Sequence, residues 1–571
     1  MDPWRSTRDL LDGLPDGAGL NIAHEAVDRH ATGAAADRTA LRCLATDGSV
    51  TEVTYAALAH RSSQVAHALE DLGLTAGDRL FLLLGRTPAQ YAVAHGALKT
   101  RAVVCTLFAA FGPEPIRARL ELGGARVLVT TPTLYDRKIA SLLEADDALP
   151  QLEHVLLVGQ PDDRQRPRAQ WLDPLLDRFP QQYRIGPTDP DTPAFLHFTS
   201  GTTGRPKGAL HVHEAVVGHL ATARLVLELR EGDVYWCTAD PGWVTGTSYG
   251  LVAPLVVGAT AVVDEAEFDS ARWYRILAEQ KVAVWYTAPT AVRRLMRAGV
   301  ALAQKFDLSS LRLVASVGEP LNPEAIRWGE SALHRTIRDT WWQTETGCIM
   351  IAGYGGEPVP AGALGRPVPG ITAAVMVSDE EGRAVRTDGH VREEDAGRPG
   401  ELALRRGWPS MFRAYLDQPE RYDAAFVDGW YLTGDVVRRD QHGRFWFVGR
   451  ADDVIKSSGH LISPFEVESL LMEHPAVVEA GVIGRPDPLI GEVVKAFVVT
   501  QTGVEPTETL RLDLLGFARR RLGAAVAPKD IEFVEDLPKT RSGKIMRRLL
   551  RARDLGLVEG DTSTLETAVS P

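Results

Sequence analysis

The hydrophobic and polar positions in the first 200 residues predict alternating helices and strands. Between residues 54 and 73, apolar residues recur at helical spacing from Leu58 to Leu72, and Gly73 stops the run. The same reasoning predicts a strand at 80–84, a helix at 89–99, and strands at 102–108 and 125–131. Strands that alternate with helices are typical of parallel βαβ units, so we expect an α/β sheet.

Several later apolar runs end in a turn that contains glycine or proline. A helix-like segment at 214–229 precedes runs at 283–289 and 311–320, and both runs stop at such turns. Ligands of open α/β sheets collect at the carboxyl ends of the strands. We therefore expect a ligand site where these turns meet.

The pattern changes from about residue 353, where turns separate short β-runs. This texture predicts a β-rich subdomain over about 353–451. Asp452 lies between two glycine-containing turns and marks a plausible domain boundary. The fold class expected is α/β, with a large N-terminal domain (1–451) of α/β subdomains plus this β-rich part.

The remaining residues predict a small α+β C-terminal domain over 452–560, followed by a polar tail at 561–571. Ser463, Pro464 and Glu466 have the residue types of a helix start, with an N-cap, proline at the first position and glutamate at the third. The segments after it predict a strand at 493–500, a helix at 510–523 and a strand at 530–538.

Residues 195–209, FLHFTSGTTGRPKGA, have the composition of a phosphate-binding loop after a strand. The stretch combines hydroxyls, glycines and one lysine: Thr199, Ser200, Gly201, Thr202, Thr203, Gly204 and Lys207. Glycines let successive N–H groups converge on an anion, and the hydroxyls and the ammonium add donors. The order is not that of a Walker A loop, and a flexible surface turn is the alternative interpretation.

Composition narrows the class of protein. The 571 residues carry a net charge of −12, which argues against a general nucleic-acid or anionic-membrane binder. The four cysteines show no paired spacing, so neither a zinc site nor a disulfide framework is indicated. We see no apolar signal segment and no apolar run near the ~20 residues of a membrane span, and we expect a cytoplasmic protein.

Seven motifs in a fixed order carry a resemblance to a known family. They are TSGTTGRPKGA, TADPGWVTG, SVGEPLNPE, DTWWQTETG, YLTGD, VGRADDVIKSSG and LPKTRSGKIMRR. Together they resemble the acyl-adenylate-forming superfamily, and within it the AMP-forming acetate–CoA ligases in their shorter bacterial form. The resemblance extends from about Asn21 to Arg553 and implies the substrates acetate, ATP and CoA, with Mg²⁺ on the phosphates.

The resemblance also implies site residues for the nucleotide. It places the β and γ phosphates at 199–207 and the base and α-phosphate at Gly318, Glu319, Pro320, Asp339, Thr340, Trp341, Trp342, Gln343 and Thr344. Thr344 offers a hydroxyl and Glu345 a hard oxygen for Mg²⁺. Asp435 would accept from the ribose hydroxyls beside Arg450, although a turn-capping role for Asp435 is the structural alternative. Lys544 would bridge the acyl carboxylate and the α-phosphate.

The acyl pocket and the CoA site follow from the same resemblance. Val244, Thr245, Val317 and Trp342 would surround the acyl group, and an indole there would leave room for about two or three carbons, since one methylene is worth only ~1–3 kcal/mol. Core packing is the alternative for Trp342. Thr245, Ser458, Gly459 and Arg519 would contact CoA, although Arg519 also suits a solvated helix face. Family members rotate a mobile C-terminal domain about an aspartate that matches Asp452.

Two features depart from the family pattern. Leu461 stands where close relatives usually carry an arginine that contacts ATP, and residues 377–400 look longer than the usual β-turn. Three hypotheses therefore stay open: an acetate–CoA ligase, a ligase for propionate or another short acid, and a nucleotide-binding sensor without ligase activity. Lys544 also resembles a lysine whose acylation silences the family, which implies a protein acetyltransferase and deacetylase as partners.

Overall fold

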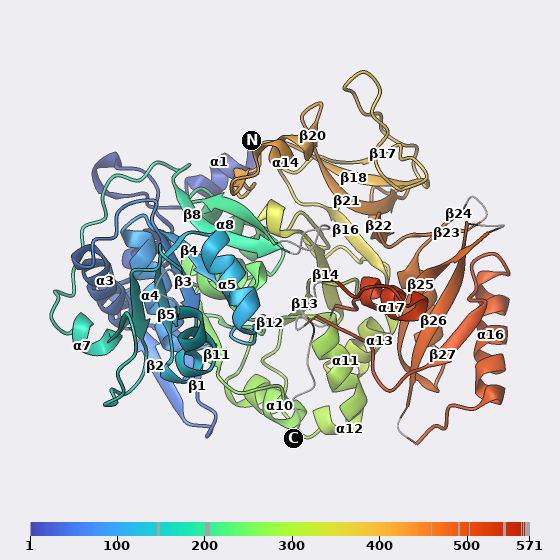
Figure 1. The fold of residues 1–571 in the computed structure, drawn as a ribbon, viewed down its shortest axis with the longest axis horizontal. Coiled ribbons are helices and arrows are strands. Elements are labelled where there is room, and N and C mark those ends of the chain that lie inside the picture. The colour runs from blue at the N-terminus through green and yellow to red at the C-terminus, as the bar shows by residue number, and fades with distance from the viewer. Residues whose placement is uncertain are drawn as a thin grey trace.

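The computed structural model describes residues 2–144, 149–199, 206–457, 460–488, 491–501, 503–540, 544–560, 562 and 565. The chain forms α/β layers in its first 450 residues and a smaller α+β domain beyond them (Figure 1). The C-terminal domain packs beside helices α11 (Pro289–Ala298) and α13 (Pro323–Ala332) of the larger part. The expected α/β fold class is confirmed.

One sheet contains the strands predicted from the first 200 residues. Its order is β19 (Ala414–Tyr415), β9 (Lys207–Val212), β8 (Pro193–Thr199), β4 (Val103–Thr106), β3 (Arg79–Leu83), β5 (Ala125–Thr130), β6 (His154–Leu157) and β7 (Ala169–Trp171). Strands β3 to β6 pair in parallel, whereas β8 and β9 form an antiparallel hairpin that pairs Thr199 with Lys207. The predicted phosphate loop is the segment of sequence that connects these two strands.

A second, longer sheet runs through the middle of the protein. Its order is β17 (Ala373–Met376), β18 (Pro399–Arg405), β21 (Trp430–Arg439), β22 (Phe445–Arg450), β16 (Ala363–Pro367), β15 (Ile351–Ala352), β14 (Ile337–Trp341), β13 (Leu313–Ser316), β12 (Val284–Thr287), β10 (Val234–Cys237), β11 (Thr260–Asp264), β1 (Thr39–Leu44) and β2 (Val50–Thr54), with β20 (Phe426–Val427) beside β21. Strands β10 to β14 are parallel, and β14 to β16 are antiparallel. The β-rich segment therefore continues the central sheet.

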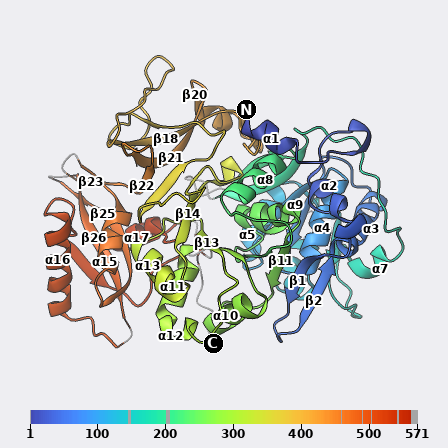
Figure 2. The ribbon, with the colours of Figure 1, turned by 180° about the vertical axis from the view of Figure 1, so that it is seen from behind.

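Helices cover these two sheets. The longer ones are α3 (Tyr55–Asp71), α4 (Pro88–Lys99), α5 (Pro113–Leu122), α8 (Ala215–Leu225), α10 (Ser270–Glu279), α11 and α13. The shorter ones are α1 (Pro3–Arg8), α2 (Ile22–Ala26), α6 (Pro132–Leu134), α7 (Leu172–Leu176), α9 (Ala253–Val257), α12 (Val300–Ala303), α14 (Pro419–Ala424) and the π-helix η6 (Gly246–Val252). Helix α3 begins after the N-cap Thr54 and packs against α4 on the outer side (Figure 2), so the helix predicted at 54–73 is confirmed.

The C-terminal domain is built on a separate small sheet. Its strands are β24 (His460–Ile462), β23 (Ile455–Ser457), β26 (Gly491–Thr500), β25 (Val477–Asp487) and β27 (Asp530–Phe533), and its helices are α15 (Pro464–Met472), α16 (Glu508–Leu522) and α17 (Arg547–Leu555). The predicted helix start is confirmed, because the Ser463 side chain accepts a hydrogen bond from the Glu466 backbone N–H and Pro464 opens the helix.

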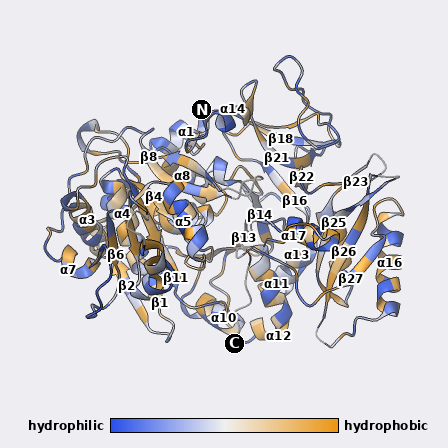
Figure 3. Cartoon of the chain, viewed as in Figure 1, coloured by the Kyte–Doolittle hydropathy of each residue, from blue (hydrophilic) through white to orange (hydrophobic). Residues whose placement is uncertain are grey.

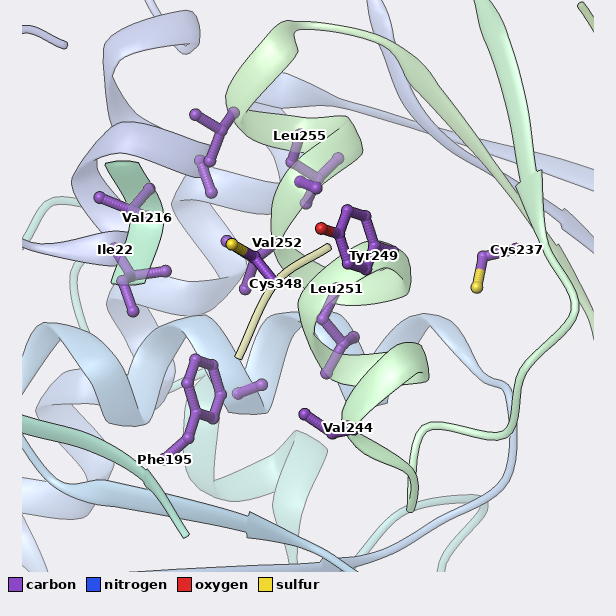
Figure 4. Packing of buried hydrophobic residues seen from close by; sticks show 14 of the residues in the cluster. Ile22, Phe195, Val216, Cys237, Val244, Tyr249, Leu251, Val252, Leu255 and Cys348 are labelled. Carbon is purple, nitrogen blue, oxygen red and sulfur yellow. The ribbon is translucent and has the colours of Figure 1, made fainter. Parts of the chain in front are cut away.

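Apolar residues concentrate along the strands and on the inner faces of the helices (Figure 3). The largest core joins both sheets of the N-terminal domain, and Figure 4 shows part of it around Tyr249 and Phe195. All four cysteines are buried and free, and burial raises the pKa of Cys237 to about 11 and of Cys348 to about 12. Among the described residues, we find no helix of the length and apolar character that a membrane crossing needs.

Candidate active site

A cleft of about 680 Å³ opens where the sheets of the N-terminal domain meet the C-terminal domain. Its walls come from the ends of β8, β13 and β14, from the segment before η6, and from β21 and β22. The residues that the C-terminal domain contributes include Glu468, Glu479, Thr540, Lys544, Ile545 and Arg547. Turns at the carboxyl ends of parallel strands thus converge, as the sequence predicted.

Lys207 and Glu345 are joined at the phosphate-loop end of the cleft. Lys207 Nζ lies 2.7 Å from Glu345 Oε1 and donates to the Tyr415 hydroxyl at 2.8 Å. The Tyr415 hydroxyl in turn donates to Glu345 Oε1 at 2.7 Å. Burial alone would raise the pKa of Glu345, but the Lys207 charge and these two hydrogen bonds outweigh it and hold the pKa below its usual value.

Thr199 and Lys207 lie at the two ends of the predicted phosphate loop, and both line the cleft. The Thr199 hydroxyl is buried and has no hydrogen-bond partner among the described residues, so it can serve a ligand oxygen. Ser200, Gly201, Thr202, Thr203 and Gly204 fall outside the described residues, as do Ser458 and Gly459.

The segment after β13 forms a second wall. Gly318 has φ +94°, a left-handed value that favours glycine, and Glu319 and Pro320 follow it in the lining. Asp339 lies behind them and accepts hydrogen bonds from Ser316 Oγ at 3.0 Å, Leu321 N–H at 3.2 Å and Thr340 N–H at 2.9 Å. Burial raises the pKa of Asp339 to about 7, and these donors offset part of that effect.

Asp435 is buried in the middle of β21 and accepts hydrogen bonds from two side chains of the DTWWQTE motif. Its Oδ2 accepts hydrogen bonds from Trp341 Nε1 at 2.9 Å and from Gln343 Nε2 at 3.0 Å. Arg450 faces Asp435 in the register of β21 and β22, and the Asp435 charge raises the pKa of Arg450. Thr344 follows in the one-turn helix η7 (Thr344–Thr346) and also lines the cleft. This arrangement leaves Asp435 Oδ1 without a donor among the described residues.

Trp342 lines the cleft, as do the three other residues predicted for the acyl group: Val244, Thr245 and Val317. Only 8% of Trp342 is exposed, and its indole N–H donates to the Tyr286 hydroxyl at 3.0 Å. The four residues expected to surround the acyl group are thus brought together. Tyr286, which belongs to no motif, is an addition that the sequence did not indicate.

Lys544 enters the same cleft from the C-terminal domain. Its backbone carbonyl accepts a hydrogen bond from the Thr540 N–H at 2.7 Å. Burial, and after it the charge of Arg450, lowers the pKa of Lys544, while Asp453 and Asp435 act in the opposite direction. Lys207 and Lys544, which lie 337 positions apart in the sequence, therefore line one cavity.

An ion-pair cluster in the wall of the cleft joins the two domains, and sequence reasoning missed it. Glu479 on β25 lies 2.8 Å from Arg297 and 3.6 Å from Arg293, both on α11, and 2.6 Å from Lys539. Arg293 also lies 2.5 Å from Glu319 in the cleft wall. No motif contains Glu479 or these arginines, so only the folded chain reveals the cluster.

Two other predicted residues, Asp452 and Arg519, are exposed. Asp452 is among the cleft-lining residues and lies 2.6 Å from Arg383, which belongs to the long charged segment at 377–400. Arg519 is exposed on α16, on the outer side of the C-terminal domain (Figure 1), and is not among the cleft-lining residues.

One carboxylate of the cleft would suit a magnesium ion that is also bound to the phosphates of a nucleotide. Glu345 supplies one carboxylate near the phosphate loop. No group of three or more potential metal-ligating His, Cys, Asp or Glu side chains occurs in the part of the chain that the structure describes. Magnesium commonly binds through one or two carboxylates plus substrate phosphates and waters, and Glu345 fits that pattern.

Comparison with known families agrees with this geometry. Residues 27–416 match the AMP-binding enzyme family, and residues 466–544 match the AMP-binding enzyme C-terminal domain. The chain belongs to the AMP-binding enzyme family.

Curated relatives narrow the comparison to one activity. A protein of Bacillus subtilis named acetyl-coenzyme A synthetase is 44% identical over 550 residues, which cover 96% of this chain and 93% of the relative. A protein of the same name from Methanothrix thermoacetophila is 39% identical, over 96% of this chain and 85% of its own length.

Solved structures share the fold over nearly the whole chain. An acyl-CoA synthetase of Brucella canis aligns with a TM-score of 0.74 and 35% identity, over 97% of each chain. An anthranilate CoA ligase in complex with anthranoyl-AMP aligns with a TM-score of 0.82 and 29% identity, over 94% of this chain and 97% of that chain.

Proposed function

We propose that the chain is an AMP-forming acetate–CoA ligase. It joins acetate to ATP as acetyl-adenylate, releases pyrophosphate, and transfers the acetyl group to CoA with release of AMP. The observation that carries the proposal is the single cleft in which Lys207, Glu345 and Lys544 converge from two domains. Relatives named acetyl-coenzyme A synthetase match almost the entire chain and support acetate as the acid.

In the first half-reaction two anions must meet, so positioning and charge neutralisation dominate. Thr199 and Lys207 hold the β and γ phosphates together with the loop at 200–204. Lys544 brings its ammonium to the acyl carboxylate and the α-phosphate. Glu345 would hold a magnesium ion brought by the nucleotide, and that ion would supply positive charge to the phosphates.

The remaining nucleotide contacts follow the placement of the cleft walls. Asp435 accepts from the ribose hydroxyls with Arg450 beside it, and Thr344 donates to the α-phosphate. The base lies against the following wall residues: Gly318, Glu319, Pro320, Asp339, Thr340, Trp341, Trp342 and Gln343. Their position in one lining supports this assignment.

The acyl group lies at the apolar end between Val244, Thr245, Val317 and Trp342. CoA reaches it past Thr245, Ser458 and Gly459 after the C-terminal domain turns about Asp452. Arg519 contributes to CoA binding only if that turn brings α16 toward the cofactor, because here its side chain is exposed on the outer side.

Acetate-dependent ATP–pyrophosphate exchange tests the proposal directly. The purified protein is assayed with acetate, propionate and isobutyrate, first without CoA for exchange and then with CoA for thioester formation. Exchange and acetyl-CoA formation that favour acetate support the assignment. Preference for propionate or isobutyrate would make it a ligase for that acid. ATP binding without exchange would make it a nucleotide sensor.

We also propose that a protein acetyltransferase and a deacetylase regulate the chain at Lys544. Acylation would remove the charge on which adenylation depends. Chemical acetylation followed by mass spectrometry and an exchange assay tests this idea, with the loss of exchange expected to follow the modification of Lys544. Full exchange by protein acetylated at Lys544 would refute it.

A further inference from the structure

A chain of hydrogen bonds behind the acyl end of the cleft starts at Trp342. Its indole Nε1–H donates to the Tyr286 hydroxyl at 3.0 Å. The Tyr286 hydroxyl lies 2.8 Å from Thr340 Oγ1, which lies 2.7 Å from the Ser316 carbonyl. This series of hydrogen bonds therefore links the carboxyl ends of strands β12, β13 and β14.

The direction of each hydrogen bond in this chain is determined. The Ser316 carbonyl can only accept, so Thr340 Oγ1 donates its one proton to it. The Tyr286 hydroxyl must then donate to Thr340, and it accepts from the indole, which is a donor only. Every proton is used once, so none of these three side chains can turn without leaving a buried polar group unpaired.

Tyr249 restrains the same ring from a second side. Its ring lies edge-on to Trp342 at 5.2 Å and edge-on to Tyr286 at 5.4 Å. The Tyr249 hydroxyl is itself held, at 2.7 Å by Thr222 and at 2.8 Å by the Ile349 N–H. Tyr249 lies in η6, five positions after the predicted acyl-pocket residue Val244 (Figure 4).

We propose that Tyr286 is a positioning residue that sets the length of the acid this protein accepts. Its hydroxyl holds the Trp342 indole across the apolar end of the cleft, and the indole limits the space beyond the acyl carbon. The proposal rests on the ligase function proposed above. Binding energy alone discriminates poorly between acids, because each added methylene gains just ~1–3 kcal/mol. Discrimination therefore depends on steric exclusion by the Trp342 ring, and the ring excludes a longer acid only if it cannot rotate.

The test compares Tyr286→Phe with wild type on acetate and propionate. Without the hydroxyl, the indole N–H loses its acceptor and the ring gains freedom. We expect the ratio of kcat/KM for propionate to that for acetate to rise roughly three- to tenfold, the range that one neutral hydrogen bond represents. The KM for ATP should stay unchanged. The matched control is Tyr274→Phe, because the buried Tyr274 hydroxyl has no partner among the described residues.

A second set of variants separates positioning from a general loss of packing. In a Trp342→Gly background, Tyr286→Phe should leave the substrate ratio unchanged, since the ring it holds is gone. Thr340→Ser, which keeps the hydroxyl, should retain the wild-type ratio, and Thr340→Val should shift it toward propionate.

If the wild-type protein forms acetyl-CoA, three outcomes would overturn the proposal. The propionate-to-acetate ratio of kcat/KM could stay unchanged in Tyr286→Phe. Alternatively, Tyr286→Phe could shift this ratio equally in the Trp342→Gly background, or Tyr274→Phe could shift it as much as Tyr286→Phe does. A wild-type protein without acetate-dependent exchange would instead remove the proposed function, so the two failures are distinct.

Discussion

Lys207 Nζ lies 2.7 Å from Glu345 Oε1, and the Tyr415 hydroxyl completes a triangle with both. The strand hairpin that carries the phosphate loop is thereby joined to the motif that follows β14. The cation expected to bind phosphate and the carboxylate expected to hold magnesium therefore form an ion pair with each other.

Lys207→Met is expected to raise the pKa of Glu345, because the charge and hydrogen bond that offset its burial are lost. In the wild type the pairing stabilises the fold above the ordinary glutamate value of 4.5 and is lost as the pH falls through the lowered folded-state value. The variant should therefore be less stable than the wild type at pH 7. Its free energy of unfolding should also decrease less than that of the wild type when the pH is lowered.

Urea unfolding at pH 7 and pH 4, followed by tryptophan fluorescence, measures this difference. All 12 tryptophans precede residue 452, so the signal reports the N-terminal domain. Tyr415→Phe serves as a control that keeps the ion pair. Equal pH slopes for Lys207→Met and wild type would contradict the prediction.

Lys544→Ala should lower acetate-dependent pyrophosphate exchange by about 100-fold or more, the usual cost of removing one group that stabilises developing charge. ATP affinity should change only a few-fold, since the loop with Lys207 remains. Lys529→Ala is the matched control, because Lys529 is an exposed lysine of the same domain. Exchange at a wild-type rate in Lys544→Ala would exclude the role proposed for this residue.

Glu479→Gln should loosen the contact between the domains. It leaves Arg293, Arg297 and Lys539 without their shared carboxylate, and breaking a buried pair in this way costs about 3–5 kcal/mol. We expect amide hydrogen exchange in α11 and β25 to accelerate at least tenfold.

Asp536→Asn provides the comparison for that experiment. Asp536 also contacts Lys539, at 3.1 Å, but 74% of its side chain is exposed, and exposed pairs contribute about 1 kcal/mol or less. Similar exchange in both variants would show that the Glu479 cluster does not hold the domains together.

Acid should destabilise the N-terminal domain through its buried histidines. Burial lowers the pKa of His213 to about 3, and its Nδ1 accepts a hydrogen bond from the Ile22 N–H. Between pH 6.5 and about 3, His213 is protonated in the unfolded chain but not in the folded chain. The free energy of unfolding therefore decreases by up to about 1.4 kcal/mol for each unit by which the pH is lowered.

His213→Gln removes that site from both the folded and the unfolded state. Between pH 6.5 and 5, the slope of unfolding free energy against pH should therefore decrease by an amount that corresponds to at most one bound proton. The exposed His60 offers the control variant His60→Gln. The measurement is the slope of unfolding free energy against pH, again by tryptophan fluorescence. An unaltered slope in His213→Gln would mean that His213 does not contribute.

Local patterns were sufficient to predict the α/β layers, because caps, periodicity and turns act over a few residues. The helix with N-cap Thr54 and the one with N-cap Ser463 are examples. The joining of the β-rich segment to the central sheet was not predictable, since the link is the two-residue strand β15 (Ile351–Ala352), which leaves no periodic signal.

The residues of the candidate site also differ in whether the sequence predicts them. Lys207, Glu345 and Lys544 lie in motifs whose residue types carry their chemistry. Tyr286 and Glu479 lie in ordinary apolar strands. Their roles depend on partners such as Trp342, 56 positions from Tyr286, and Arg297, 182 positions from Glu479. Sequence alone gives no register between such distant segments, so these contacts emerge only in the folded chain.

The burial of all four cysteines has a consequence for how the protein can be handled. Its proposed cofactor carries a free thiol, and the acyl-adenylate reacts with any accessible sulfur nucleophile. Because the thiols of Cys43, Cys105, Cys237 and Cys348 are enclosed, the folded chain offers no sulfur of its own to compete for the activated acetyl group. It should likewise resist alkylating reagents and form no mixed disulfide with oxidised CoA, so purification without a reducing agent should leave its activity intact.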